Sequence, residues 1–207
     1  MLDKYTTRWV KPPLLYSARL LERCGIKADQ LTLLGFALGL AAMLAVALQA
    51  YSWALLLLLA NRILDGLDGA LARLSQPTDA GGFLDITLDF IFYSGLVWAF
   101  ALANPAEHGL AAATLIFSFI GTGGSFLAFA ALAERRQIKH PDFGHKSLYY
   151  IGGLAEGTET ILVFIAFCLW PQHFVALAYG FALICALTTV TRIWAGYRTL
   201  KVSDQTE

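Results

Sequence analysis

Six apolar stretches, each close to the length that crosses a lipid bilayer, follow one another along this chain of 207 residues. A transmembrane helix needs about 20 consecutive, mostly apolar residues. Backbone polar groups inside a bilayer must be satisfied within the segment, so such stretches form helices. The sequence therefore predicts an all-α integral membrane protein, a six-transmembrane-helix bundle with spans near residues 31–50, 52–72, 82–103, 110–132, 150–170 and 174–194.

The composition agrees with a membrane protein. Hydrophobic residues make up 57% of the chain and charged residues only 14%, whereas about a quarter of the residues in a typical soluble domain are charged. The three cysteines are widely scattered and lack metal-ligand spacing, so neither a disulfide framework nor a zinc site is indicated.

The basic residues are distributed asymmetrically. All fifteen Lys and Arg residues lie before the first span, in the final turns of the second span, after the fourth span, or at the end of the chain. The other three connections, around residues 49–51, 104–109 and 171–173, carry none. The positive-inside rule therefore predicts that both termini are cytoplasmic.

The segment before the first span mixes aromatic, apolar and basic residues between positions 5 and 23. This pattern is typical of an amphipathic helix that lies in the membrane interface. Pro12 and Pro13 are expected to start or kink that helix. We expect three parts: a cytoplasmic N-terminal segment with the interfacial helix (1–30), a six-helix membrane domain (31–200) and a cytoplasmic tail (201–207).

Four aspartates lie where the second and third spans approach the cytoplasm: Asp65, Asp68, Asp85 and Asp89. Each pair shares one helix face because its members are three or four residues apart. The short link between the spans predicts antiparallel neighbouring helices and one cluster of four acids. An acid at a helix centre costs about 2.5–3.5 kcal/mol, and two divalent cations would cancel four negative charges. Carboxylates suit Mg²⁺ or Mn²⁺, so we expect a two-metal site.

These residues are embedded in a recognisable motif. The sequence resembles the CDP-alcohol phosphotransferase (CDP-alcohol phosphatidyltransferase) family, whose signature is D-x2-D-G-x2-A-R, about eight residues, then G-x3-D-x3-D. Seven residues separate Arg73 from Gly81. The alternative Gly82 restores eight but leaves two residues before Asp85. Gly81 is preferred because it shares a helix stripe with Asp85 and Asp89.

The resemblance implies a role for each residue of the motif. Asp65, Asp68 and Asp85 are implied metal ligands, and Asp89 is both a ligand and the general base. The cytidine nucleotide is implied to approach the helices at positions with small side chains, namely Gly69, Ala72 and Gly81. Arg73 can offer a planar set of donors to a diphosphate; alternatively, it is an interfacial Arg paired with an Asp.

The resemblance also implies a function in phospholipid biosynthesis. The expected reaction moves a phosphatidyl group from a CDP-linked lipid, CDP-diacylglycerol being the expected donor, to an alcohol, and releases CMP. The implied cofactors are two divalent ions, magnesium or manganese. Membrane lipids and a second copy in a homodimer are the expected partners, and nucleic acid is not. The expected location is a bacterial inner membrane, with the active site facing the cytoplasm.

The acceptor alcohol stays open in the sequence. A basic loop after the fourth span could bind an acceptor phosphate through Arg135, Arg136, Lys139 or Lys146, or these cations could serve topology alone. Glu156 and Glu159 could hydrogen-bond a polyol or a cationic acceptor. Alternatively, they interact with a helix N-terminus.

Two other functions use similar residues. An intramembrane prenyltransferase also binds a diphosphate through Asp-rich motifs and Mg²⁺, but such enzymes resemble larger bundles with two separated motifs. A small cation transporter could use the same acids. It would not explain Gly69, Ala72, Arg73 and Gly81 at their spacings.

Overall fold

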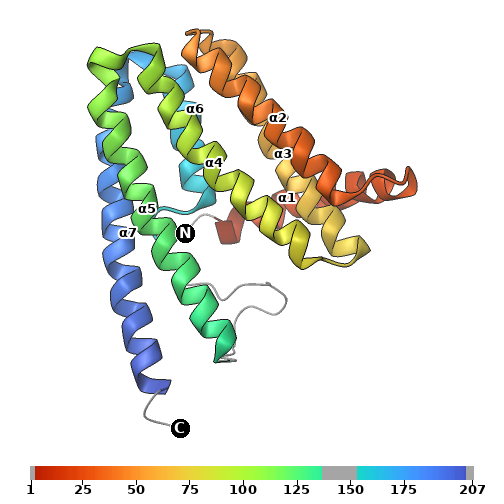
Figure 1. The fold of residues 1–207 in the computed structure, drawn as a ribbon. Coiled ribbons are helices and arrows are strands. Elements are labelled where there is room, and N and C mark those ends of the chain that lie inside the picture. The colour runs from red at the N-terminus through yellow and green to blue at the C-terminus, as the bar shows by residue number, and fades with distance from the viewer. Residues whose placement is uncertain (1–2, 137–152, 204–207) are drawn as a thin grey trace.

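The computed structural model of the chain describes residues 3–136 and 153–203, and all regular structure within them is helical (Figure 1). The all-α expectation is thereby confirmed. The helices are α1 (Asp3–Arg23), α2 (Ala28–Ala47), α3 (Tyr51–Ser75), α4 (Asp79–Ala103), α5 (Pro105–Arg135), α6 (Gly157–Leu169), the 3₁₀ turn η1 (Pro171–His173) and α7 (Phe174–Ser203).

Four segments of the described residues are long and apolar enough to cross a membrane: α2, α4, α5, and η1 together with α7. Helix α3 has sufficient length, but Asn61, Arg62, Asp65 and Asp68 make its second half polar. Helix α6 has 13 residues, about 20 Å at 1.5 Å per residue, against a hydrocarbon core of about 30 Å. Each expected span has a helix, but the expected span at 150–170 yields a helix only from Gly157; positions 150–152 lie outside the described residues.

A helix, α1, covers the segment in which an interfacial amphipathic helix is expected. Pro12 and Pro13 lie inside it and do not start it, because the helix already begins at Asp3. The chain turns toward α2 through Gly25, whose φ of 76° is favourable for glycine, and the Gly25 N–H donates to the Glu22 carbonyl at 2.9 Å.

Helix α2 packs against both α3 and α4. Two glycines on α2 make this approach possible. A Cβ on Gly35 would lie 3.4 Å from the Cβ of Leu64, and one on Gly39 would lie 2.8 Å from the Phe92 ring. In contrast, α3 and α4 do not pack along each other's length. The expectation that they are packed antiparallel neighbours is wrong in this respect, because α2 is the helix that holds both.

The remaining helices complete the bundle. Helices α5 and α7 lie side by side along one edge of the molecule, and α4 also packs against α5 (Figure 1). A buried aromatic core joins α4, α6 and α7, and its centre is the stacked pair Phe100 and Phe174, with ring centroids 4.6 Å apart. Phe92, one turn from Asp89 on α4, belongs to the same core. The half of α4 beyond the acids is therefore fixed by packing.

Candidate metal centre and nucleotide site

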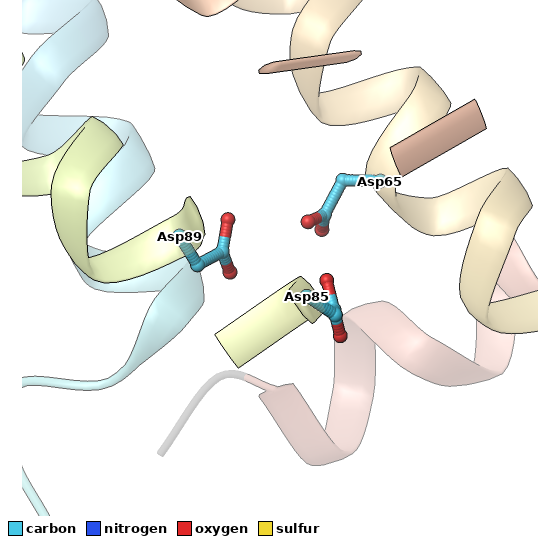
Figure 2. Close-up of side chains that lie close together, drawn as sticks. All are labelled: Asp65, Asp85 and Asp89. Atoms are coloured by element: carbon cyan, nitrogen blue, oxygen red, sulfur yellow. The ribbon is translucent and has the colours of Figure 1, made fainter. Parts of the chain in front are cut away.

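Three carboxylates from two helices converge in the structure. Asp65 comes from α3, and Asp85 and Asp89 come from successive turns of α4; one oxygen of each lies within 4.8 Å of the other two (Figure 2). All three side chains are partly buried. Like charges at this separation repel one another in a medium of low dielectric constant. An arrangement of this kind is suited to a divalent cation held by oxygen ligands.

Asp68 lies one turn further along α3 and lines the same cavity as the other three acids. Its residue is only 4% exposed, and its Oδ2 is buried without a hydrogen-bond partner among the described residues. It stands outside the set of three whose oxygens converge. A buried oxygen of this kind is costly unless a partner compensates it. A bound cation in the shared cavity fits this requirement.

Arg62 is a further charged residue of this cavity. Its Nη2 donates to Asp89 Oδ1 at 2.9 Å, and its Nη1 lies 3.6 Å from Asp65 Oδ2. Four ionised carboxylates and one guanidinium give −4 + 1 = −3 at the cavity. The positive-inside pattern accounts for Arg62 only as a topological charge, and its place in the site was not predicted. Its position three residues before Asp65, on the same helix face, was the available signal.

The residues expected to face the nucleotide flank the acids. Gly69, Ala72 and Arg73 occupy the last turns of α3 after Asp68. A Cβ on Gly69 would lie 3.5 Å from Arg73 Nη1, which is ordinary contact. Arg73 is exposed and makes no ion pair within the described parts of the chain, so its donors are accessible from outside the helix.

Gly81 lies in the first turn of α4, where its N–H donates to Thr78 Oγ1 at 3.1 Å. A Cβ at this position would lie 2.9 Å from Asp29 Oδ1 and 3.1 Å from Thr78 Oγ1. A Cβ on Gly82 would meet nothing within 4 Å. The two glycines therefore differ in local crowding, and substitutions at them can be compared directly.

We expect Gly81→Ala to raise the donor KM about tenfold or more, and Gly82→Ala to change it less than about twofold. Asp29 is exposed, so its carboxylate can rotate away, and both variants should keep a melting temperature close to that of the parent in detergent. Donor kinetics and thermal unfolding measured on the same preparations check this. Equal kinetic effects at both positions would contradict a specific role of Gly81 in donor binding.

A second cavity, of about 280 Å³, lies between α4, α5, α6 and α7 and shares Asp89 with the acidic cavity. Polar groups of Ser94, Thr122, Thr160, Glu156 and Arg192 contribute to its lining. Asp89 thus lines both the compact acidic cavity and the larger cavity, whose wall is mostly apolar with a few polar groups.

Arg192 was not among the residues expected to bind a ligand. It is 7% exposed, its Nη1 donates to the Thr122 carbonyl at 3.1 Å, and its guanidinium lies over the Phe126 ring at 5.7 Å. The positive-inside pattern accounts for Arg192 only as a charge near the end of the last expected span. A buried Arg in a membrane helix usually faces an interior site, and this depth was not evident from the sequence.

The expected acceptor residues are placed differently from one another. Glu156 lines the second cavity and occupies the N-cap position of α6, but its Oε1 accepts from the Gly153 N–H at 2.8 Å and makes no cap bond to the helix. Glu159 does not line that cavity. Arg135 and Arg136 are exposed at the end of α5 and line neither cavity. Lys139 and Lys146 lie outside the described residues.

Similar proteins agree with the motif and the fold. Inner membrane protein YnjF of Escherichia coli is 54% identical over 201 residues, which cover 97% of this chain and 98% of that protein. Archaetidylinositol phosphate synthase of Pyrococcus horikoshii is 31% identical over 203 residues, which cover 97% of each chain.

Two solved structures of Mycobacterium tuberculosis phosphatidylinositol phosphate synthase share the fold. The one with CDP-DAG bound has a TM-score of 0.67 at 23% identity and covers 89% of this chain and 93% of that one. The one in complex with manganese and citrate has a TM-score of 0.69 at 21% identity and covers 89% of this chain and 88% of that one.

The sequence profile of one enzyme family matches residues 26–195 and includes every acid described above. The motif, the geometry and these relatives agree, and the chain belongs to the CDP-alcohol phosphatidyltransferase family.

Proposed function

We propose that this protein transfers a phosphatidyl group from CDP-diacylglycerol to a hydroxyl of a polar acceptor and releases CMP. The observation that carries the proposal is the single cavity lined by Asp65, Asp68, Asp85 and Asp89, in which three carboxylates converge and the fourth holds an unpartnered buried oxygen. The CDP-DAG bound to the M. tuberculosis structure supports the choice of donor.

The same four acids would hold two divalent ions, Mg²⁺ or Mn²⁺. Manganese in the second M. tuberculosis structure and the charge of −3 at the cavity support this proposal. When bound, such ions neutralise the oxygens of a diphosphate and polarise the phosphorus that is attacked. We place the nucleotide at the adjoining ends of α3 and α4, beside Gly69, Ala72 and Gly81, with Arg73 donating to the phosphates.

Asp89 is the proposed general base. Its Oδ1 accepts from Arg62, and the residue borders both cavities. An acceptor hydroxyl in the larger cavity could reach Asp89, because Asp89 lines both cavities. The bond from the acceptor oxygen to the lipid-side phosphorus forms, the bond from that phosphorus to the CMP oxygen breaks, and Asp89 takes the hydroxyl proton.

The larger cavity is the proposed acceptor site. Hydroxyl and carboxylate groups along its wall suit an acceptor with several hydroxyls, and Arg192 suits one anionic group on it. The name of the P. horikoshii relative, an inositol phosphate lipid synthase, is consistent with an acceptor of this class. The exposed Arg135 and Arg136 line neither cavity, which favours a topological role for them.

Arg192→Gln is expected to raise the acceptor KM about tenfold or more while donor KM changes less than about twofold, because a charged hydrogen bond to the acceptor is lost. Arg136→Gln is the matched control, and it should leave both constants within about twofold. Thermal unfolding of both variants checks folding. If Arg136 or Arg135 controls acceptor KM and Arg192 does not, the acceptor site belongs to the α5 terminus.

We also propose six membrane spans in a homodimer, with α6 and the residues that precede it together forming the fifth span, and with both termini and the acids on the cytoplasmic side. The distribution of Lys and Arg supports this topology. In a cysteine-free background, single cysteines at Glu107 and His173 should react with an impermeant maleimide added outside intact cells. A cysteine at Arg135 should react only after lysis. The reverse pattern would overturn the orientation.

Release of CMP distinguishes this function from its two rivals. Purified protein in detergent micelles is given Mn²⁺ and CDP-diacylglycerol with a panel of polyol and polyol-phosphate acceptors, and CMP is quantified. A prenyltransferase would instead release diphosphate from a prenyl diphosphate, and a transporter would move Mn²⁺ into proteoliposomes without lipid turnover. Release of CMP that depends on an acceptor is the expected result, and its absence with every acceptor would contradict the proposal.

A further inference from the structure

Arg62 is held in a fixed position by contacts on several sides. Its Nε donates to Asn61 Oδ1 at 2.6 Å, and Asn61 Nδ2 donates to the Gly35 carbonyl of α2 at 2.8 Å. Asn61 is 2% exposed. The guanidinium is therefore attached through Asn61 to the helix that packs against both α3 and α4.

Two aromatic side chains of α4, Phe92 and Tyr93, also contact this guanidinium. Its Cζ lies 4.6 Å from the centroid of the Phe92 ring and 5.4 Å from that of Tyr93, and its Nη1 donates to the Tyr93 hydroxyl at 3.2 Å. The Arg62 side chain is 13% exposed. Since a guanidinium does not lose its proton in proteins, this position carries a permanent positive charge.

The charge acts on two of the converging carboxylates. Nη2 lies 2.9 Å from Asp89 Oδ1 and Nη1 lies 3.6 Å from Asp65 Oδ2. The guanidinium of Arg62 therefore contacts one acid on α3 and one on α4. Because α3 and α4 do not pack along each other, this ionic contact is one of the links that join them at the site.

We propose that Arg62 is a resident cation of the acidic centre with two separable effects. Its charge weakens the attraction of the four carboxylates for divalent ions. Its planar geometry fixes Asp89 through Oδ1, which makes it a positioning residue for proton acceptance. The second effect rests on the function proposed above, whereas the first does not.

Two substitutions separate charge from geometry. Arg62→Gln changes the formal charge at the cavity from −3 to −4 and keeps a side chain that can hydrogen-bond. Arg62→Lys keeps the charge but offers a point-like ammonium in place of the planar group of donors. The control is Arg198→Gln, because Arg198 is exposed on α7 beside Trp194 and lines neither cavity.

Mn²⁺ binding to the purified full chain is titrated by electron paramagnetic resonance of the free ion. We expect Arg62→Gln to bind Mn²⁺ about tenfold or more tightly than the parent. Arg62→Lys and Arg198→Gln should stay within about threefold of it. Unchanged or weaker Mn²⁺ binding by Arg62→Gln, with a melting temperature near that of the parent, would overturn the charge effect.

CMP release at saturating Mn²⁺ and donor is then compared for the same proteins. Both Arg62 variants should lose kcat about tenfold or more, with donor KM changed less than about threefold, since positioning acts on turnover. Parent-like kcat in Arg62→Lys would overturn the positioning effect. If the parent itself releases no CMP with any acceptor, the proposed function fails, and the Mn²⁺ titration still decides the charge effect.

Discussion

Replacement of Asp89 by Asn is expected to lower the rate of transfer about 10²- to 10⁴-fold, the range that positioned proton transfer typically contributes. The amide is nearly isosteric with the carboxylate but cannot accept the proton of the acceptor hydroxyl. Asp89 is the acid of the cluster that borders both the acidic cavity and the larger cavity. Binding of the donor should suffer less than turnover, because three acids of the cluster remain.

Asp79→Asn is the matched control for this variant. Asp79 lies on the same helix, in its exposed first turn, and lines neither cavity, so its rate should stay within about twofold of the parent. Since Asp89 is also a proposed metal ligand, Mn²⁺ occupancy and donor affinity are measured on the same preparation. A rate for Asp89→Asn within about threefold of the parent, with Mn²⁺ still bound, would remove Asp89 from the role of base.

Removal of divalent ions should reduce transfer to background, a loss of about 10³-fold or more. The physical reason is charge: with all four carboxylates ionised, the side chains of the cavity have a formal charge of −3, and a diphosphate would bring further negative charge into the same space. Metal stabilisation of such oxygens is worth several kcal/mol, and each 1.36 kcal/mol is tenfold in rate. Mg²⁺ or Mn²⁺ added in excess of the chelator should restore the activity.

The control for chelation is the chelator already saturated with Mg²⁺, which should leave the rate unchanged. Dilution into each buffer at constant detergent concentration excludes an effect on the micelles. Full activity in excess free chelator, after dialysis that removes bound Mn²⁺, would contradict a metal-dependent mechanism.

The acidic cluster was predictable because it depends on local spacing. Residues three or four apart share a helix face whatever the rest of the fold does, and Asp85 and Asp89 therefore point the same way on α4. Their meeting with Asp65 followed from the short link at residues 76–78. The detailed packing did not follow, because the glycines of α2 decide which helices approach closely.

The number and extent of the spans were less predictable. Counting apolar residues treats the stretch before Leu169 as one helix, but α6 begins only at Gly157. Helix α3 shows the opposite problem: its length suits a span, while its second half carries the polar side chains of the site. In α3 the requirements of the site compete with the average hydropathy that identifies a span.

Arg62 and Arg192 show a further limit of the sequence. The positive-inside rule treats each Arg as a charge at the membrane surface, and both residues fit the expected side. The partial burial of Arg62, the burial of Arg192, and the contacts of Arg62 with Asp89 and of Arg192 with Thr122 depend on neighbouring helices. For Arg62, its spacing from Asp65 provided a signal; for Arg192, the sequence provided none.

The most direct test of the metal centre is equilibrium binding of CDP-diacylglycerol to the purified protein with Mn²⁺ or with chelator. The parent should bind the lipid with Mn²⁺ and lose about tenfold or more in affinity in chelator, because the four acids would hold the ions that neutralise the diphosphate. A variant with both Asp65→Asn and Asp85→Asn should bind weakly in either buffer, whereas Asp79→Asn should match the parent. Tight binding by the parent in chelator, or by the double variant in Mn²⁺ at parent affinity, would contradict a metal-held donor at this cluster.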